Sequence, residues 1–279
     1  MLAIKRALCI IVALSVFISA EDDIEDSAEH EWDVLIFTQH WPATVCSDWK
    51  KKGSAHSCSL PSQKDAWTIH GIWPTKLGTI GPGFCNNTWH FNSSQLQPIE
   101  AQLEQNWINI EKDTPLYSLW QHEWTKHGTC AAVLPLLAGE TKYFAQGLRW
   151  LQLYSMSDIL MKAGFTPDSN QSYNAAEMYA GIKNRIGKNP SVHCEVDTET
   201  GKSYIFEIRI CFDKSLELVD CDGIKVRGEH AYGTLLHCDP SKPVVYTDII
   251  PNLQQSHSTW EWPLTEIYKL VMWLQWFTL

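Results

Sequence analysis

The sequence predicts a single α+β domain in which helices flank a central antiparallel sheet and disulfides staple the fold. Segments rich in β-forming residues occur in the first and last thirds of the chain, and the segments between them carry apolar residues at helical spacing. This order of strands, helices and strands is typical of an α+β domain. No internal repeat, low-complexity tract or Pro/Gly-rich linker divides the 279 residues, so one domain is expected.

Short runs of β-branched and aromatic residues predict the strands. In one of them Phe206, Ile208 and Ile210 alternate with the charged Glu207 and Arg209, which is typical of a half-buried antiparallel strand. The second strand is expected to stop at proline 74, and a loop with three lysines is expected between the first two strands. The predicted strands are Asp33–Gln39, Trp67–Trp73, Val192–Val196, Ser203–Phe212, Leu216–Cys221 and Val244–Thr247.

Helices are predicted in the middle of the chain, where apolar residues recur at intervals of three and four. Gly164 and Gly187 are the expected stops of two of these helices. The predicted helices are Leu96–Ile110, Leu116–His127, Lys142–Ala163 and Ala175–Ile186.

Both ends of the chain differ from the domain between them. Residues 1–20 combine Lys5 and Arg6, an apolar run and small residues before Glu21, which is the layout of a cleavable secretory signal. The apolar run is too short to span a membrane, which takes about 20 residues. The domain is therefore expected at residues 21–250. Residues 251–279 form a C-terminal tail whose apolar end suits a docking helix, a poorly packed tail or a membrane anchor, and these alternatives stay open.

The cysteine count predicts a disulfide framework. Nine cysteines become eight when Cys9 leaves with the signal, and an even number in an exported chain favours up to four bridges. Local spacing favours Cys46–Cys58 and Cys211–Cys221, and the spacing of the other four leaves their pairing open. No CxxC pair is present, so a structural zinc site is not expected. Three sequons support export and predict glycosylation at Asn86, Asn92 and Asn170.

The formal net charge of -10 argues against a protein that holds nucleic acid on a broad basic surface. A local cleft that binds a few nucleotides remains compatible with it. All 11 histidines lie outside the signal segment, and they would gain positive charge as the pH falls toward about 5.

Residues 120–130, WQHEWTKHGTC, gather four reactive side chains on one predicted helix. At about 100° per residue, His122, Glu123, Lys126 and His127 fall on one arc of less than half the helix circumference. A solvated charged helix face is the alternative. A zinc site of the His-Glu-x-x-His type needs histidines at i and i+4, whereas His122 and His127 are five apart and diverge by about 140°. No metal is therefore expected.

Residues 67–74, WTIHGIWP, hold a further histidine on a predicted strand. Strand alternation places His70 on the face opposite to that of Ile69, Gly71 and Trp73. Gly71 leaves room for the close approach of a ligand or backbone. Alone, His70 suits a structural role, but together with the histidine-bearing helix it completes a pair of acid and base from two elements.

These two segments resemble the signature segments of the ribonuclease T2 family, secreted acid endoribonucleases of animals, plants and fungi. Residues 39–42, QHWP, resemble the family's early segment, and the cysteine layout through Cys238 is similar as well. The resemblance runs from about residue 32 to about residue 247 and is nearest to vertebrate lysosomal and secreted members. It implies the pairs Cys85–Cys130 and Cys194–Cys238 beside the two local ones.

The resemblance also implies a role for each matching residue. His127 would be the general base that takes a proton from the ribose 2′-hydroxyl, and His70 would be the general acid that protonates the departing 5′-oxygen. Glu123 and Lys126 would assist the crowded phosphorane, and His122 would bind phosphate. Imidazole suits both proton transfers because its unperturbed pKa is about 6.5.

The implied activity is metal-independent cleavage of RNA by its own 2′-hydroxyl, which leaves 2′,3′-cyclic phosphate ends and needs no cofactor. RNA is the expected substrate of a monomer without a stable protein partner or, after signal cleavage, a transmembrane segment. The lysosome lumen or the extracellular space is the expected location. A catalytically silent recognition protein on the same fold is one alternative, disfavoured because both histidines are present, and a zinc metallohydrolase is another.

Base recognition is predicted from aromatic and amide side chains near the matched segments. Stacking on an aromatic ring tolerates any base. Most of the 14 tryptophans are expected in the core. Gln39, Trp41 and Trp73 are the candidate base contacts.

Overall fold

A computed structural model of the chain describes residues 31–53, 55–198, 200–225 and 234–251. The predicted signal peptide and nearly all of the predicted C-terminal tail lie outside these ranges, so the expectations for both segments stay predictions. Within the described ranges, no helix combines the length and the apolar character that crossing a membrane requires.

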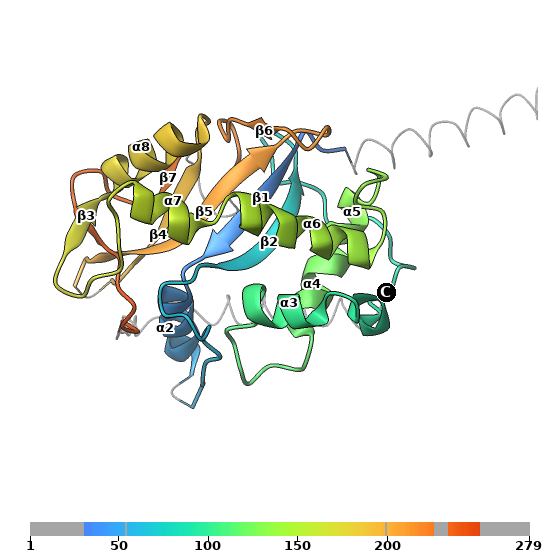
Figure 1. The fold of residues 1–279 in the computed structure, drawn as a ribbon, viewed down its shortest axis with the longest axis horizontal. Coiled ribbons are helices and arrows are strands. Elements are labelled where there is room, and N and C mark those ends of the chain that lie inside the picture. Colours follow the sequence, from blue (N-terminus) through green and yellow to red (C-terminus); the bar gives the residue numbers. More distant parts are fainter. Residues whose placement is uncertain (1–30, 54, 199, 226–233, 252–279) are drawn as a thin grey trace, which may run out of the picture.

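The described residues form one α+β domain around an open sheet, as the sequence predicts (Figure 1). Its main path runs β2-β1-β5-β4-β7, and the pairs β2·β1, β1·β5 and β5·β4 are antiparallel. Two short pairs, β4·β7 and β5·β8, are parallel, so the sheet is mixed at its periphery. The strands are β1 Val34–His40, β2 Thr68–Thr75, β3 Ser172–Asn174, β4 Ser191–Val196, β5 Ser203–Phe212, β6 Leu218–Val219, β7 Leu235–Leu236 and β8 Pro243–Val245.

One face of the sheet packs against the helices that follow the middle of the chain (Figure 1). In α6, Trp150 stacks on Phe212 of β5, with ring centroids 3.9 Å apart, and also contacts Phe37 of β1. These side chains are almost fully buried, so this interface is the main hydrophobic core. The helical segments are α2 Pro42–Lys52, η1 Ser93–Leu96, α3 Glu100–Asn106, α4 Ser118–Glu123, η2 Trp124–Gly128, α5 Thr129–Ala131, α6 Glu140–Leu153, α7 Met156–Lys162 and α8 Ala175–Ile186.

Several predicted helices are shorter than expected, and each difference has a local cause. The segment predicted at 142–163 is two helices, because Ser155 starts a new one by accepting a hydrogen bond from the backbone N–H of Asp158. The segment predicted at 96–110 contains Pro98, which separates a 3-10 turn from α3. The loop expected after β1 is instead the helix α2, which has Pro42 in its first turn. The prediction for α8 is confirmed, with Asn174 and Gly187 as its caps.

The charged side chains that alternate along β5 point to the opposite face of the sheet. Glu207 and Arg209 were expected on the exposed side of a half-buried strand, yet they are only 2% and 6% exposed. They sit in register with His40 and Thr38 of β1 and lie on the face away from Phe212. This second face is therefore a polar layer within the domain.

A bulge in β2 changes the direction of its side chains. Thr38 pairs with Gly71 and the next residue, Gln39, pairs with Ile69, so His70 has no partner of its own across the strands. A bulge of this kind redirects the inserted residue. It brings His70 to the same side as Gly71 and Trp73, whereas simple alternation predicts that His70 lies on the face opposite to these two residues. Pro74 continues the strand because β2 lies at the edge of the sheet.

All four predicted disulfides are present. The two local pairs and the two pairs implied by the resemblance match the structure: Cys46–Cys58, Cys85–Cys130, Cys194–Cys238 and Cys211–Cys221.

Candidate active site

His70 is held from three sides. The indole Nε1 of Trp107 donates a hydrogen bond of 2.8 Å to the backbone oxygen of His70. The ring Nδ1 of His70 lies 2.6 Å from Oε1 of Glu207, and the indole of Trp73 stands edge-on to the imidazole, with ring centroids 5.1 Å apart. The side chain of His70 is 32% exposed, so one side of the ring remains accessible.

The helical segment after Tyr117 brings the other predicted residues together, but not as a regular α-helix. The α-helix ends at Glu123, and residues 124–128 form a π-helical turn. Such single turns inside helices are frequent at functional sites. Glu123 is 1% exposed, whereas His122 is exposed. The residues predicted on one arc of a regular helix therefore differ in their surroundings, because the carboxyl group of Glu123 is buried and the imidazole of His122 faces solvent.

Trp73 connects the two elements. Its ring lies 5.1 Å from that of His70 and 5.7 Å from that of His127, measured between centroids. Its Nε1 donates a hydrogen bond of 2.9 Å to Oε2 of Glu123. Gly71 makes this arrangement possible, since a Cβ there would lie 2.0 Å from that carboxyl oxygen and 2.3 Å from the indole nitrogen. The strand and the helical segment thus meet around one indole.

The two histidines have opposite pKa shifts. Burial of His127 lowers its pKa well below 6.5, and the positive charges of Lys126, His122 and His70 act in the same direction. Burial also tends to lower the pKa of His70, but the attraction of the Glu207 carboxylate outweighs it and raises the pKa above 6.5. At mildly acidic pH one imidazole is therefore neutral and the other is protonated.

His122 and Glu123 are shifted as well. Burial, followed by the charge of Lys126, lowers the pKa of His122, so the protonated form of this imidazole is disfavoured in the free protein. Burial raises the pKa of Glu123 to about 7. Glu123 is thus a neutral carboxyl group at acidic pH and a carboxylate above neutrality.

A cavity of about 420 Å³ opens beside His70 and His122. Its walls combine apolar side chains such as Leu119 and Phe206 with polar groups. His40 also lines it, and its buried Nε2 has no hydrogen-bond partner. The volume is in the range of small-molecule sites. The complete lining is His40, Val45, Asp48, Lys52, His70, Asn109, Ile110, Glu111, Thr114, Pro115, Ser118, Leu119, His122 and Phe206.

Two of the three candidate base contacts lie in the core instead. Gln39 is fully buried, donates to the backbone oxygen of Tyr154 and accepts from the N–H of Met156, so it joins β1 to the junction of α6 and α7. Trp41 is 1% exposed and donates to the backbone oxygen of Thr247. Gln39 belongs to β1, whose seven residues are all buried, and Trp41 follows that strand as the buried N-cap of α2, so neither side chain is exposed to a base as expected. Trp73 does lie at the site.

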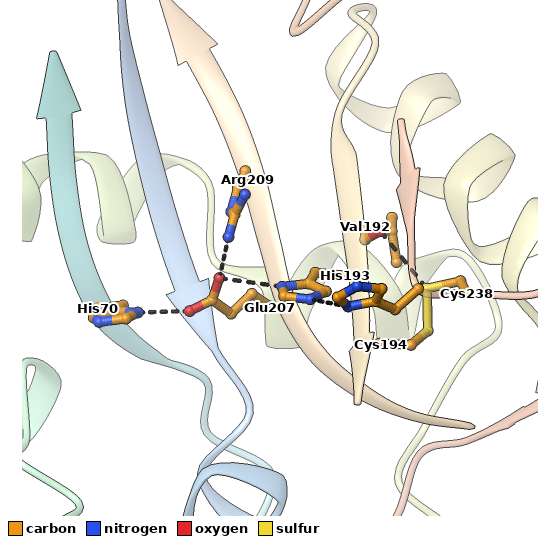
Figure 2. A network of polar contacts seen from close by, with 8 residues as sticks. His70, Val192, His193, Cys194, Glu207, Arg209 and Cys238 are labelled. Carbon is orange, nitrogen blue, oxygen red and sulfur yellow. Dashed lines mark hydrogen bonds and ion pairs between the residues drawn. A yellow bond between two sulfur atoms is a disulfide. The ribbon is translucent and has the colours of Figure 1, made fainter. Parts of the chain in front are cut away.

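Sequence reasoning missed the polar layer behind His70. Figure 2 shows Glu207 between His70 and Arg209, with His193 of β4 alongside. The alternation of charged and apolar residues in β5 is the sequence signal for this layer. The same alternation is typical of a strand with one solvent-facing side, so it does not reveal that the charged side is buried. His40 lies in the QHWP segment, and no local sequence pattern assigns it a role.

The spacing of His122 and His127 does not keep their donor atoms apart, contrary to the expectation from a regular helix. Donor atoms of His122, Glu123 and His127 lie within 4.8 Å of one another, because the π-helical turn brings positions i and i+5 to one side. These are residue types that zinc accepts.

Comparison with known proteins identifies the family. The family model described as "Ribonuclease T2 family" matches residues 32–221. Ribonuclease Oy of Magallana gigas is 37% identical over 69% of this chain and 88% of its own, and human ribonuclease T2 is 32% identical over 76% and 78%. The crystal structure of human RNase T2 superposes with a TM-score of 0.61 and 28% identity, covering 78% of this chain and 99% of that one. RNase NT in complex with 5′-AMP gives a TM-score of 0.62 and 26% identity, covering 78% and 98%. The chain therefore belongs to the ribonuclease T2 family.

Proposed function

We propose that this endoribonuclease cleaves RNA by transphosphorylation, with His127 as the general base and His70 as the general acid. His127 takes the proton of the ribose 2′-hydroxyl while the 2′-oxygen bonds to phosphorus. The bond from phosphorus to the 5′-oxygen breaks, and His70 gives that oxygen its proton. The products are a 2′,3′-cyclic phosphate and a free 5′-hydroxyl.

The observation that carries this proposal is the opposite pKa shift of the two histidines on either flank of Trp73. A base must start neutral and an acid must start protonated. The lowered pKa of His127 and the raised pKa of His70 supply both states at the same pH. RNA provides the nucleophile, so the protein has only to align the groups and move two protons.

Lys126 and His122 would meet the negative charge that grows on the phosphorane. The charge of Lys126 lies close enough to lower the pKa of both neighbouring histidines. A neutral His122 still donates one ring N–H to a phosphate oxygen. Glu123, bonded to Trp73, would donate a hydrogen bond to the same oxygens when it is protonated at acidic pH.

The cavity beside His70 and His122 would hold a nucleobase next to the scissile phosphate. The apolar side chains of the cavity offer a surface on which a base can stack. Trp73, whose ring lies next to that of His70, is the remaining candidate for a base contact.

The setting that suits this chemistry is an acidic or extracellular one. The signal-like start, four disulfides and three sequons favour export to the lysosome lumen or the exterior, with glycans on Asn86, Asn92 and Asn170. Asn92 and Asn170 are exposed and Asn86 is half-buried. We expect a monomer that needs no cofactor and no stable protein partner.

The test is digestion of RNA by the purified chain at pH values from about 4 to about 8 in the presence of EDTA. We expect loss of the polymer with 2′,3′-cyclic phosphate ends, and no cleavage of DNA, which lacks the nucleophile. His127→Ala should lower kcat by about 10² to 10⁴. The control His90→Ala, at an exposed histidine outside the site, should leave the rate unchanged. Intact RNA bound by the wild-type chain would instead support a recognition protein.

A further inference from the structure

Glu207 lies at the centre of a buried polar layer whose side chains come from the three strands β2, β5 and β4. Its Oε1 lies 2.6 Å from Nδ1 of His70 on β2, and its Oε2 lies 2.7 Å from Nη2 of Arg209 on the same strand, β5 (Figure 2). Nδ1 of His193 on β4 lies 3.7 Å from Oε2. Both carboxyl oxygens are therefore engaged, and the carboxyl group is 2% exposed.

The surroundings of Glu207 keep it ionised. Burial alone would raise the pKa of this carboxyl group, but the positive charges of Arg209 and His70 and the polar contacts with His193 and His70 hold it well below the ordinary value. An ionised carboxylate has no hydrogen to donate. The short contact with His70 is therefore a hydrogen bond in which Nδ1 is the donor, and such charge-assisted bonds are strong.

This bond determines which nitrogen of His70 can serve the substrate. With Nδ1–H committed to Glu207, the ring presents Nε2 on its accessible side. The layer is held in turn: Arg209 lies over the indole of Trp73 at 5.3 Å, and Nε2 of His193 contacts Nδ1 of His237 at 3.0 Å, next to the bridge Cys194–Cys238. Figure 2 shows this support extending from β2 to β4 and beyond.

We propose that Glu207 is the positioning residue of the general acid: it fixes the Nδ1–H tautomer and the orientation of His70, so that Nε2 delivers the proton to the leaving oxygen. Arg209 and His193 hold the carboxylate in place. The proposal rests on the acid role of His70 given above, and Glu207 itself touches no reacting atom.

Other charged groups also face His70, and the test has to separate them from Glu207. His40 approaches from β1, with ring centroids 5.1 Å apart, and its pKa is lowered by burial and by His70 to about 3, so it stays neutral. The charge of Glu123 raises the pKa of His70 and that of Arg209 lowers it, and both effects are smaller than those of Glu207. The helical segment adds the charges of His122 and His127, whose pKa values His70 lowers.

The experiment compares Glu207→Gln, His70→Ala and the double variant, with RNA as substrate. Glutamine keeps the size of the side chain but removes the charge. We expect E207Q to lower kcat by about tenfold or more near pH 6.5, with KM changed less than about twofold, and to move the high-pH limb of the rate profile down by about one pH unit. In the His70→Ala background the same change should alter kcat less than about twofold, because Glu207 acts through His70.

Two further measurements test the contact between Glu207 and His70 if E207Q is less stable than the wild type. At a pH above the raised pKa of His70, where the ring is neutral, the ¹⁵N shifts of His70 in the folded wild-type protein should report the Nδ1–H tautomer, and E207Q should lose this preference. Glu207→Asp, which keeps the charge, should restore the high-pH limb toward that of the wild type. The matched control is Glu195→Gln on the neighbouring strand β4, where the carboxylate pairs with Lys51 at 2.6 Å, and its rate profile should not change.

The outcomes distinguish this inference from the proposed function. Equal losses of kcat from E207Q with and without His70 would show a structural role and overturn the positioning inference alone. A His70→Ala variant with the wild-type kcat would overturn the acid role and the inference with it. An Nε2–H tautomer in the wild-type protein would overturn the inference whatever the rates are.

Discussion

The imidazole of His122 stands edge-on to that of His127, with ring centroids 6.0 Å apart and planes at 74°. Five positions separate the two residues, and a regular α-helix would turn them about 140° away from each other. The π-helical turn at Trp124–Gly128 adds a residue to the turn and returns position i+5 to the side of position i. Glu123 lies between them, so two imidazoles and a carboxyl group share one side of the segment.

This cluster predicts inhibition by added zinc. The donor atoms of His122, Glu123 and His127 now lie within 4.8 Å of one another. Small rotations of these side chains would place each donor atom about 2.0–2.2 Å from one zinc ion, as zinc coordination requires. The bound ion would occupy the general base, so the initial rate should fall as zinc is added and return with EDTA. His122→Ala should weaken the inhibition, and Mg²⁺, which prefers oxygen ligands, should have no effect at the same concentration. A rate that needs zinc would contradict the metal-free mechanism.

The pH dependence of kcat/KM should follow the two shifted histidines. In the proposed mechanism His127 has to be neutral, and its pKa is lowered well below 6.5, so the rate should rise with pH only well below pH 6.5. His70 has to be protonated, and its pKa is raised above 6.5, so the rate should fall only above that pH. The profile of the free enzyme should therefore be a broad bell with its plateau on the acidic side and still high at pH 6.5. A maximum above pH 8, measured at constant ionic strength, would contradict the assignment of acid and base.

Local sequence patterns predicted those features whose cause is local. The strand at Ser203–Phe212, the helix at Ala175–Ile186 with its caps and the reactive residues of the helical segment all follow from periodicity and chemistry. The bulge that turns His70 toward Trp73 depends on the pairing of β2 with β1, which no single segment encodes. The same limit hid the π-helical turn, since the sequence HEWTKH is compatible with a regular helix.

Burial explains the larger errors. Glu207 and Arg209 follow the alternation of a solvent-facing strand side, but the polar layer that covers them comes from His70, fully 137 positions earlier in the chain. Gln39 lies in a strand whose seven residues are all buried, and its amide is used to hold the junction of α6 and α7. Side-chain type alone does not distinguish a buried polar network from a surface.

Gly71→Ala should disrupt the site without a change of any reactive group. The added Cβ would lie 2.0 Å from Oε2 of Glu123 and 2.3 Å from Nε1 of Trp73, so the hydrogen bond between them has to open. Because Trp73 also contacts the rings of His70 and His127, the proposed acid and base, we expect kcat to fall by about tenfold or more, since small misplacements of aligned groups are costly. Gly83→Ala is the matched control, because its Cβ would meet Lys126 at an ordinary contact distance of 3.4 Å. Equal activity of the two variants would contradict the close packing at Gly71.

Glu123→Gln should separate the stability of the site from its activity. Burial raises the pKa of Glu123 from 4.5 to about 7, so the folded protein holds a proton between these values that the unfolded chain has lost. The free energy of unfolding of the wild type should gain from this group as the pH falls from about 7 to 4.5, by about 2–3 kcal/mol. Glutamine is neutral throughout and still accepts the hydrogen bond from Trp73, so the variant should be more stable than the wild type at pH 8 and equal to it at pH 4.5. Denaturant unfolding of both proteins at these pH values measures the difference, in which the contributions of groups that do not interact with Glu123 cancel. The exposed Glu104→Gln serves as control and should show no such trend. A difference that stays constant with pH would mean that Glu123 is ionised alike in the folded and unfolded chains.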